Sequence, residues 1–188
     1  MDPRQKRNVR VPTEVRLERF FIQMPEPTKL TWSDALNAGA PDTPELAPGG
    51  KPSRLWGAES MFADAAVVAG RTEVQLIHFG KSQHEYRDLV AYAEANYLVS
   101  GHPRHCLALV EQTPQLKQVL GCSGKDFCSV SLPRPFPSIS DHDSNSVFHI
   151  LLTQDGKQTA EIDGMWRRAY FWEWFLFVPV NRKLRMTG

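Results

Sequence analysis

The sequence predicts an α+β protein of a single domain, with an antiparallel or mixed sheet, a C-terminal β-hairpin and meander, and two to four helices. Three observations indicate this class. Helical spacing of apolar residues is confined to the middle of the chain, strand-like runs dominate the second half, and Asp155-Gly156 is a strong hairpin signal between two of those runs. With 188 residues, of which 41% are hydrophobic, the chain is long enough to bury its own core.

The first half of the chain predicts strands and helices in alternation. In order, we expect a strand over 14–24 that ends at Pro25, a short helix capped by Ser33 and ending near Gly39, a helix over 58–69 and a strand over 72–79. The clearest helix follows over 83–99. Ser82 and Glu85 match a capping box there, apolar residues recur at helical spacing, and Gly101 stands where a helix C-terminus favours glycine.

The second half predicts mainly strands. We expect, in order, a short strand over 106–110, a helix beginning at Thr113-Pro114 and stopping at Gly121, a strand over 127–132, a hairpin formed by 146–153 and 158–163, and an aromatic strand over 165–180. The last segment has aromatic residues on both alternating faces, so as a strand it must be covered on both sides. A helix there would instead align Trp166, Tyr170, Trp174 and Phe177, but aromatic residues favour strands and a hairpin precedes the segment.

The hairpin signal also predicts a register. If Asp155 and Gly156 are the two turn residues, Gln154 pairs with Lys157, Leu151 lies opposite Ala160, and His149 lies opposite Ile162. His149 would then be a half-buried packing residue rather than a free catalytic base.

Two proline-rich segments predict long loops within the single domain over 1–188. The segment 39–53 contains four prolines and three glycines, and 132–145 contains Pro133, Pro135 and Pro137. Loops of this length in a compact domain are usually functional or mobile.

Charge is segregated along the chain although the net charge is only +1. Residues 1–30 carry +3 and residues 165–188 carry +4, whereas residues 31–164 carry −6. If the two ends lie close together, a positive patch would face an acidic body and could bind an anionic partner. The alternative is that these are solvated ends whose charges have no partner.

Metal binding is not expected from the cysteines and histidines. His102, His105, Cys106, Cys122 and Cys128 lie within 27 residues, but they form no C-x2-C knuckle. Pro103 is expected to prevent His102 and His105 from projecting together from a regular helix. Buried thiols and surface histidines explain the group better, and we expect neither a metal nor a cofactor.

The sequence signals for catalysis are equally weak. Cys122 lies in Gly121-Cys122-Ser123-Gly124 and could be an exposed thiol, but no known motif surrounds it. The sequence also lacks the phosphate-loop, dinucleotide-binding, zinc-protease and nucleophile-elbow motifs.

The remaining hypothesis is a binding surface near the C-terminus. Arginine neutralises phosphate and exposed tryptophan stacks on unpaired bases, so the segment would suit a nucleic acid if its tryptophans reach solvent. The expected binding residues are Arg167, Arg168, Trp172, Trp174, Arg182, Lys183 and Arg185.

Taken together, the sequence predicts a small, cytoplasmic, non-catalytic binding protein that recognises a macromolecule, with a protein the first expected partner and a nucleic acid the second. A homodimer through the aromatic segment is a further expectation. The alternative is a hydrolase that depends on cysteine and histidine or is supported by zinc. The charged N-terminus has no apolar signal region, and no apolar run is long enough to span a membrane.

Overall fold

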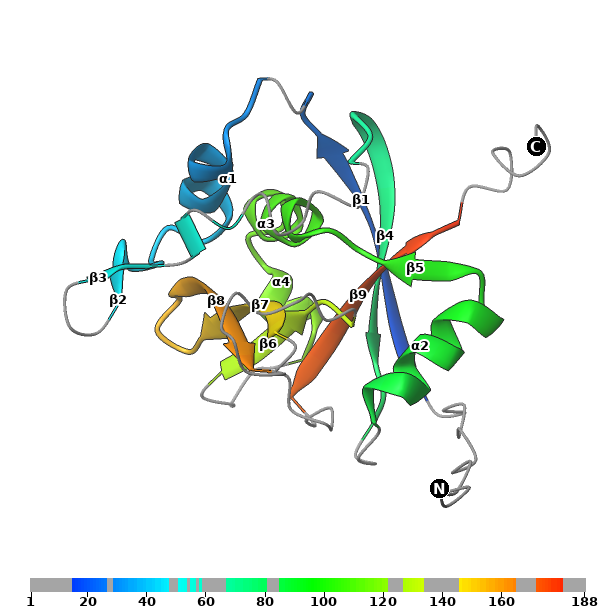
Figure 1. Ribbon diagram of the computed structural model, residues 1–188. Helices are drawn as coiled ribbons and strands as arrows, with labels where there is room; N and C mark the ends of the chain where they lie inside the picture. Colours follow the sequence, from blue (N-terminus) through cyan, green and yellow to red (C-terminus); the bar gives the residue numbers. More distant parts are fainter. Residues whose placement is uncertain are drawn as a thin grey trace, which may run out of the picture.

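The computed structural model describes residues 15–26, 29–47, 51–53, 55–56, 58, 67–80, 85–121, 127–133, 146–164 and 172–180. Within these residues it contains four helices and a mixed sheet of seven strands, which confirms the predicted α+β class with its C-terminal hairpin and meander. Helices α1 and α3 lie on one side of the sheet and α2 lies on the other (Figure 1).

The sheet follows the order β1-β4-β9-β6-β7-β8, and β5 pairs with β9. Its strands are β1 (Arg16–Met24), β4 (Gly70–His78), β5 (Leu98–Ser100), β6 (Phe127–Ser131), β7 (Ser146–Thr153), β8 (Gln158–Gly164) and β9 (Glu173–Pro179). A separate ladder joins the two-residue strands β2 (Leu46–Ala47) and β3 (Lys51–Pro52).

The aromatic strand β9 is the centre of the sheet. Phe177 pairs with both Gln75 of β4 and Ser100 of β5. Because a residue has one neighbour on each side, β4 lies along one edge of β9, and β5 and β6 share the other. Trp174 faces one core and Phe175 faces the other, and both side chains are buried. The prediction that this strand is covered on both faces is therefore confirmed for 173–179, whereas 165–171 lie outside the described residues.

The helices form a layer on each side of the sheet. α1 (Trp32–Gly39) and α3 (Pro103–Gln112) pack against each other over one face, next to the short helix α4 (Leu116–Val119). A Cβ at Gly39 would lie 2.4 Å from the backbone oxygen of Leu107, so glycine permits this close approach of the two helices. α2 (Tyr86–Ala95) covers the opposite core through Leu89 and Ala93.

The predicted register of the β7–β8 hairpin is wrong by one residue. The backbone N–H of Gly156 donates to Thr153 over 3.2 Å, and Thr153 pairs across the ladder with Lys157, so the loop has three residues and ends on Gly156 at φ 88°. His149 consequently lies opposite Glu161, not Ile162. The observed register places the buried side chains of Ile150 and Ala160 together in the core, which a one-residue slip would separate.

The strand predicted over 106–110 is also wrong, because these residues belong to α3. Pro103 occupies its first turn, where a proline removes no helical hydrogen bond. Residues 103–110 are all buried, and the continuous apolar run over 106–110 is too short for periodicity to distinguish a buried helix from a strand.

The ends of α1 and α2 differ from the predicted ends because other residues cap these helices. α2 begins at Tyr86 rather than 83 and ends at Ala95 rather than 99, because Glu85 and Asp88 form the capping box and Leu98 begins β5. Ser82 lies outside the described residues. Thr31, not Ser33, caps α1, and its hydroxyl accepts a hydrogen bond from the backbone of Asp34 over 3.1 Å.

The other predicted elements have mixed outcomes. The strands expected over 14–24, 72–79 and 127–132 are confirmed as β1, β4 and β6, and the helix expected from 113 to 121 is shortened to α4. The helix expected over 58–69 falls mostly outside the described residues, and Ala58 and residues 67–69 are not α-helical. The loop expected over 39–53 contains β2 and β3, and most of the loop expected over 132–145 lies outside the described residues.

Candidate functional site

The outer edge of β1 is open over part of its length. Gln112 of α3 bonds both backbone groups of Gln23, accepting from its N–H over 2.8 Å and donating to its C=O over 2.9 Å. The N–H and C=O of Gln23 therefore point away from β4. Because β1 and β4 pair without a bulge, the backbone groups of Leu17, Arg19 and Phe21 point outward in the same way. They have no hydrogen-bond partner among the described residues.

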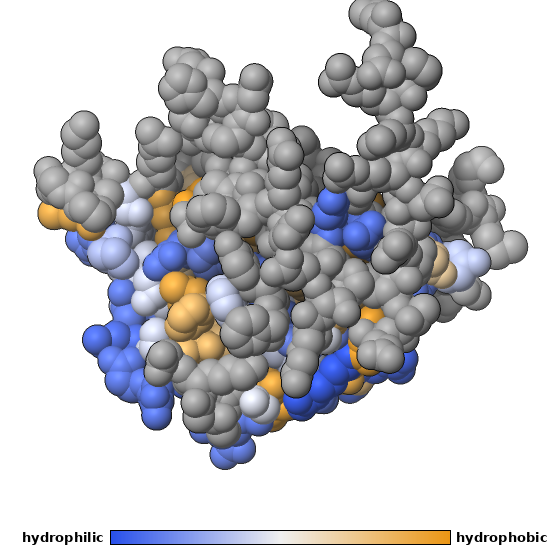
Figure 2. All heavy atoms as spheres, turned by 90° about the horizontal axis from the view of Figure 1, so that it is seen from below, coloured by the Kyte–Doolittle hydropathy of each residue, from blue (hydrophilic) through white to orange (hydrophobic). Residues whose placement is uncertain are grey.

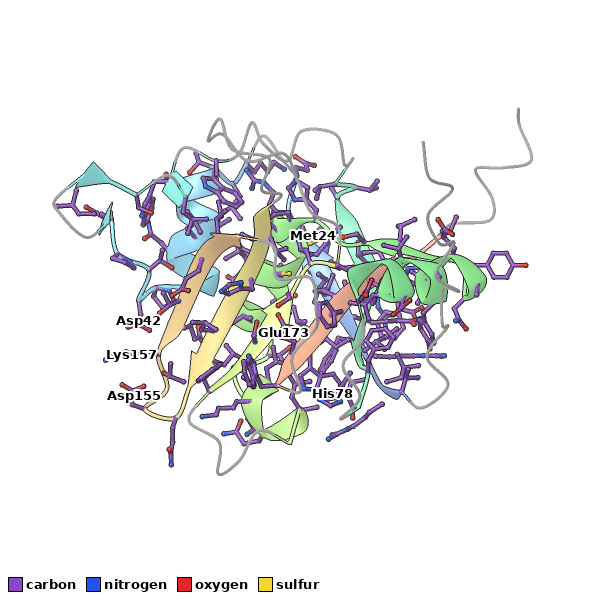
Figure 3. All side chains as sticks on the ribbon, turned by 60° about the horizontal axis from the view of Figure 1, so that its bottom comes forward. Met24, Asp42, His78, Asp155, Lys157 and Glu173 are labelled. Atoms are coloured by element: carbon purple, nitrogen blue, oxygen red, sulfur yellow. The ribbon has the colours of Figure 1, made fainter. Side chains whose placement is uncertain are left out.

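The opposite edge of the sheet is closed by the chain itself. The backbone N–H of Gln158 donates to the carboxylate of Asp42 over 2.8 Å, and that of Ala160 donates to the hydroxyl of Thr43 over 2.9 Å. Asp42 also donates its own N–H to the C=O of Gln158 over 3.1 Å. Figure 3 shows Asp42 beside the hairpin, with Lys157 and Asp155 nearer its tip.

An open groove of about 320 Å³ lies next to the free stretch of β1. Leu17 and Arg19 line it from β1, and Gln75 lines it from β4. The end of α2 and the segments around β5 and β9 supply the other lining residues, which are Tyr92, Asn96, Tyr97, Leu98, Pro179 and Val180. An edge strand and a helix end thus flank one groove.

Tyr97 occupies a strained backbone position beside this groove. Its φ is 57°, in the left-handed region that glycine or asparagine usually supplies just after a helix. Among the described residues it is the one non-glycine residue with positive φ. The side chain is 58% exposed, so burial of the aromatic ring does not explain why this residue stands here. A left-handed conformation in a non-glycine residue costs about 1 to 2 kcal/mol.

The groove carries one positive charge. Arg19 is the charged residue among those that line it, and the guanidinium forms no ion pair with a described residue. The nearby carboxylate of Glu73 accepts a hydrogen bond from the amide of Gln75 over 2.8 Å. Arg71 is close to Phe21, with its guanidinium carbon 4.4 Å from the centre of the ring. An anionic group would therefore find a free cation in the groove.

Tyr92 and Asn96 contribute polar groups to the groove. Burial raises the pKa of Tyr92 above its ordinary value of 10.0, so its hydroxyl stays protonated near neutral pH. The amide nitrogen of Asn96 donates to the C=O of Tyr92 over 2.8 Å, which fixes the side chain at the end of α2.

The binding residues expected near the C-terminus are not brought together in the described part of the chain. Trp174 is only 2% exposed and packs against His78 with ring centres 5.1 Å apart, so it offers no face to a partner. Trp172 is half-buried and lies edge-on to Phe127 at 5.5 Å. The five basic residues of the prediction, Arg167, Arg168, Arg182, Lys183 and Arg185, lie outside the described residues.

The cysteine and histidine candidates are largely structural. Cys106 is fully buried, and burial raises the pKa of its thiol far above the ordinary value. Cys128 is also fully buried, and Cys122 lies outside the described residues. Among the residues that the structure describes, no group of three potential metal ligands occurs.

His102 and His105 face each other across the first turn of α3, contrary to the expectation drawn from Pro103. The Nδ1 of His102 accepts from the backbone N–H of Arg104 over 3.1 Å, and the Nδ1 of His105 accepts from that of His102 over 3.0 Å. Both imidazoles must be unprotonated at Nδ1 to accept these bonds. Burial, with the neighbouring His102 as a second cause, lowers the pKa of His105 to about 4.

A row of polar side chains crosses β9, β6, β7 and β8, and it is buried at the end formed by Ser131 and Glu173. Ser131 donates to the carboxylate of Glu173 over 3.3 Å, and His149 lies 3.4 Å from the carboxylate of Glu161. Ser131 pairs with His149, so a serine, an imidazole and two carboxylates are neighbours. Ser131 is completely buried, however, and its hydroxyl is already hydrogen-bonded to Glu173 and Ser129. The buried end of the row therefore holds strands together, whereas the carboxylate of Glu161 at the other end is partly exposed.

Sequence reasoning missed the groove because neither of its two walls has a motif. One signal was present in the chain: Leu17 and Phe21 alternate with Phe20 and Ile22, so β1 is apolar on both faces. Apolar residues on both faces are unusual for an edge strand, and the position of β1 at the edge leaves Phe21 59% exposed. Only the strand order reveals this mismatch.

Seen from below, the hydrophobic residues of the described part form several small patches between hydrophilic ones (Figure 2). The size of an apolar patch therefore does not identify a site on that face. No helix in the described part of the chain is long and apolar enough to cross a membrane. No known protein-family model matches the chain, and no curated protein or solved structure proved similar to it.

Proposed function

We propose that this protein is a binding module that takes up an extended segment of a partner protein as an additional strand beside β1. The observation that carries the proposal is the stretch of outward backbone groups at Leu17, Arg19 and Phe21 next to an open groove. Peptides that add to a sheet edge gain affinity from main-chain hydrogen bonds and specificity from pockets for alternate side chains.

Other backbone groups at the edges of the sheet are covered by hydrogen bonds, and this supports the proposed strand addition beside β1. An exposed edge strand invites aggregation, and proteins usually cover, shorten or charge it. Here Asp42 and Thr43 cover the start of β8 at Gln158 and Ala160, and Gln112 covers the end of β1 at Gln23. Among the described residues, the stretch of β1 at Leu17, Arg19 and Phe21 has no such cover, and it lies beside the groove.

The strained conformation of Tyr97 points to the same place. A non-glycine residue held at a positive φ is often found at a binding site. Tyr97 is one of the residues that line the groove, on the wall opposite β1, and an aromatic residue offers a large contact area there. A glycine at this position would relieve the strain and remove that contact area.

A partner protein is favoured over a second copy of this chain. Antiparallel pairing of two β1 strands would match Leu17 with Phe21 only in the register that places Arg19 opposite Arg19 of the other copy. Like charges directly opposite each other destabilise a ladder. Since Trp174 is buried, the base-stacking surface expected for a nucleic acid loses one of its two tryptophans as well.

Selection from a random displayed peptide library tests the proposal, with binders then synthesised and their backbone amides N-methylated one at a time. Binding should weaken about tenfold or more when the methyl group replaces a hydrogen that faces β1, and change little at the alternating positions. Tyr97→Gly should weaken binding without lowering the free energy of unfolding. A library that yields no binder dependent on this groove, or binders insensitive to N-methylation, would overturn the proposal.

A further inference from the structure

We infer that the segment bound beside β1 carries an acidic residue with an apolar residue two positions away on each side. This inference rests on the proposed strand addition and names the chemistry of the partner. It follows from which side chains of β1 share a face.

Leu17, Arg19 and Phe21 lie on the same face of β1, since alternate residues of a strand point to the same side. All three side chains are exposed, with Leu17 at 37% and Phe21 at 59%. An added strand places its own alternate residues directly opposite them, with Cβ atoms about 5 Å apart. The three facing positions of the ligand are thus spaced two residues apart.

The central position meets the guanidinium of Arg19. Gln75, its partner across the β1–β4 ladder, donates to the carboxylate of Glu73, and Arg19 forms no ion pair with a described residue. The guanidinium offers up to five N–H donors in a planar fork that matches a carboxylate. Aspartate or glutamate at the central position would satisfy this group when the ligand displaces water.

The two outer positions meet apolar surface. Leu17 lines the groove itself, and Phe21 lies beyond Arg19 with the guanidinium of Arg71 over its ring. A branched or aromatic ligand side chain opposite each of them buries apolar area on both partners. The second cation, Arg71, shares this face with the carboxylate of Glu73, so the preference for an acidic ligand depends on Arg19.

Three short synthetic peptides test this inference. They derive from one selected binder and differ only in the residue opposite Arg19, which is Glu, Gln or Lys. Against the unaltered protein, Kd should rise in that order, with about a tenfold span between the Glu and Lys peptides because attraction is replaced by repulsion. Added salt should reduce the difference in Kd between the Glu and Lys peptides, because it screens the charges.

Reversing the charge of Arg19 in the protein is the complementary experiment. Arg19→Glu should invert the order of the three peptides, whereas the control Lys117→Glu should leave it unchanged, because Lys117 belongs to α4 and does not line the groove. Equal binding of the Glu and Lys peptides, or the same effect from both variants, would overturn the acidic preference. If groove-dependent peptides still show the alternating N-methylation pattern, the proposed strand addition survives that outcome.

Discussion

Protonation of His105 should make the stability of the fold depend on pH in a range where ordinary histidines are already charged. The imidazole is 6% exposed, and its pKa falls from the usual 6.5 to about 4. In the unfolded chain the same histidine binds a proton near pH 6.5, so between these two values the unfolded state holds more protons than the folded one. The free energy of unfolding therefore falls as pH decreases through this window.

The magnitude follows from the two pKa values. Each pKa unit corresponds to about 1.4 kcal/mol, so the full loss across the window is about 3 kcal/mol, and about 2 kcal/mol is already lost at about pH 5. Protonation at Nδ1 would also remove the acceptor for the backbone N–H of His102 and so weaken the start of α3.

Urea unfolding of the unaltered protein and of His105→Asn, at about pH 7.5 and about pH 5, measures this effect. The side-chain oxygen of asparagine can accept the same N–H, but it does not titrate, and carboxylates elsewhere contribute equally to both proteins. The unaltered protein should lose about 2 kcal/mol more than the variant between the two pH values. An equal loss in both proteins would show that His105 is not held neutral by burial.

Two further variants check the packing and the chemistry of the core. Gly39→Ala should lower the free energy of unfolding by about 2 kcal/mol or more, because its Cβ would lie 2.4 Å from the backbone oxygen of Leu107, whereas Asn37→Ala on the exposed face of the same helix should change it little. Urea unfolding midpoints decide this, and equal midpoints would contradict the close approach of α1 and α3. The thiol of Cys106 should react with a disulfide reagent only at the rate of unfolding, since it is buried and its pKa is raised, and a Cys106→Ser variant identifies its share of the signal. Fast reaction of Cys106 in the folded protein would revive the alternative of a thiol-dependent enzyme.

Local patterns in the sequence predicted much of the fold because they depend on neighbours in the chain. The apolar alternation of β1 and the helical spacing of α2 identified those elements, with errors of a few residues where Glu85 rather than Ser82 provides the cap. The strand over 106–110 was mistaken because a continuous apolar run of five residues fits a buried helix as well as a strand. The hairpin register depended on one loop residue, Gly156, whose positive φ fits either a two-residue or a three-residue loop.

The candidate site could not be predicted in the same way, because an open edge is a property of strand order. β9, the last strand in the chain, separates β4 from β6, and this long-range arrangement leaves β1 at the edge. The apolar surface of Leu17 and Phe21 would be buried if another strand lay beside them, as the corresponding surface of β9 is buried by its neighbours. β1 thus exposes apolar side chains at an edge that has no second neighbouring strand among the described residues. A partner segment beside it would supply that neighbour, and the unpaired Arg19 between the two apolar side chains would determine which segment fits.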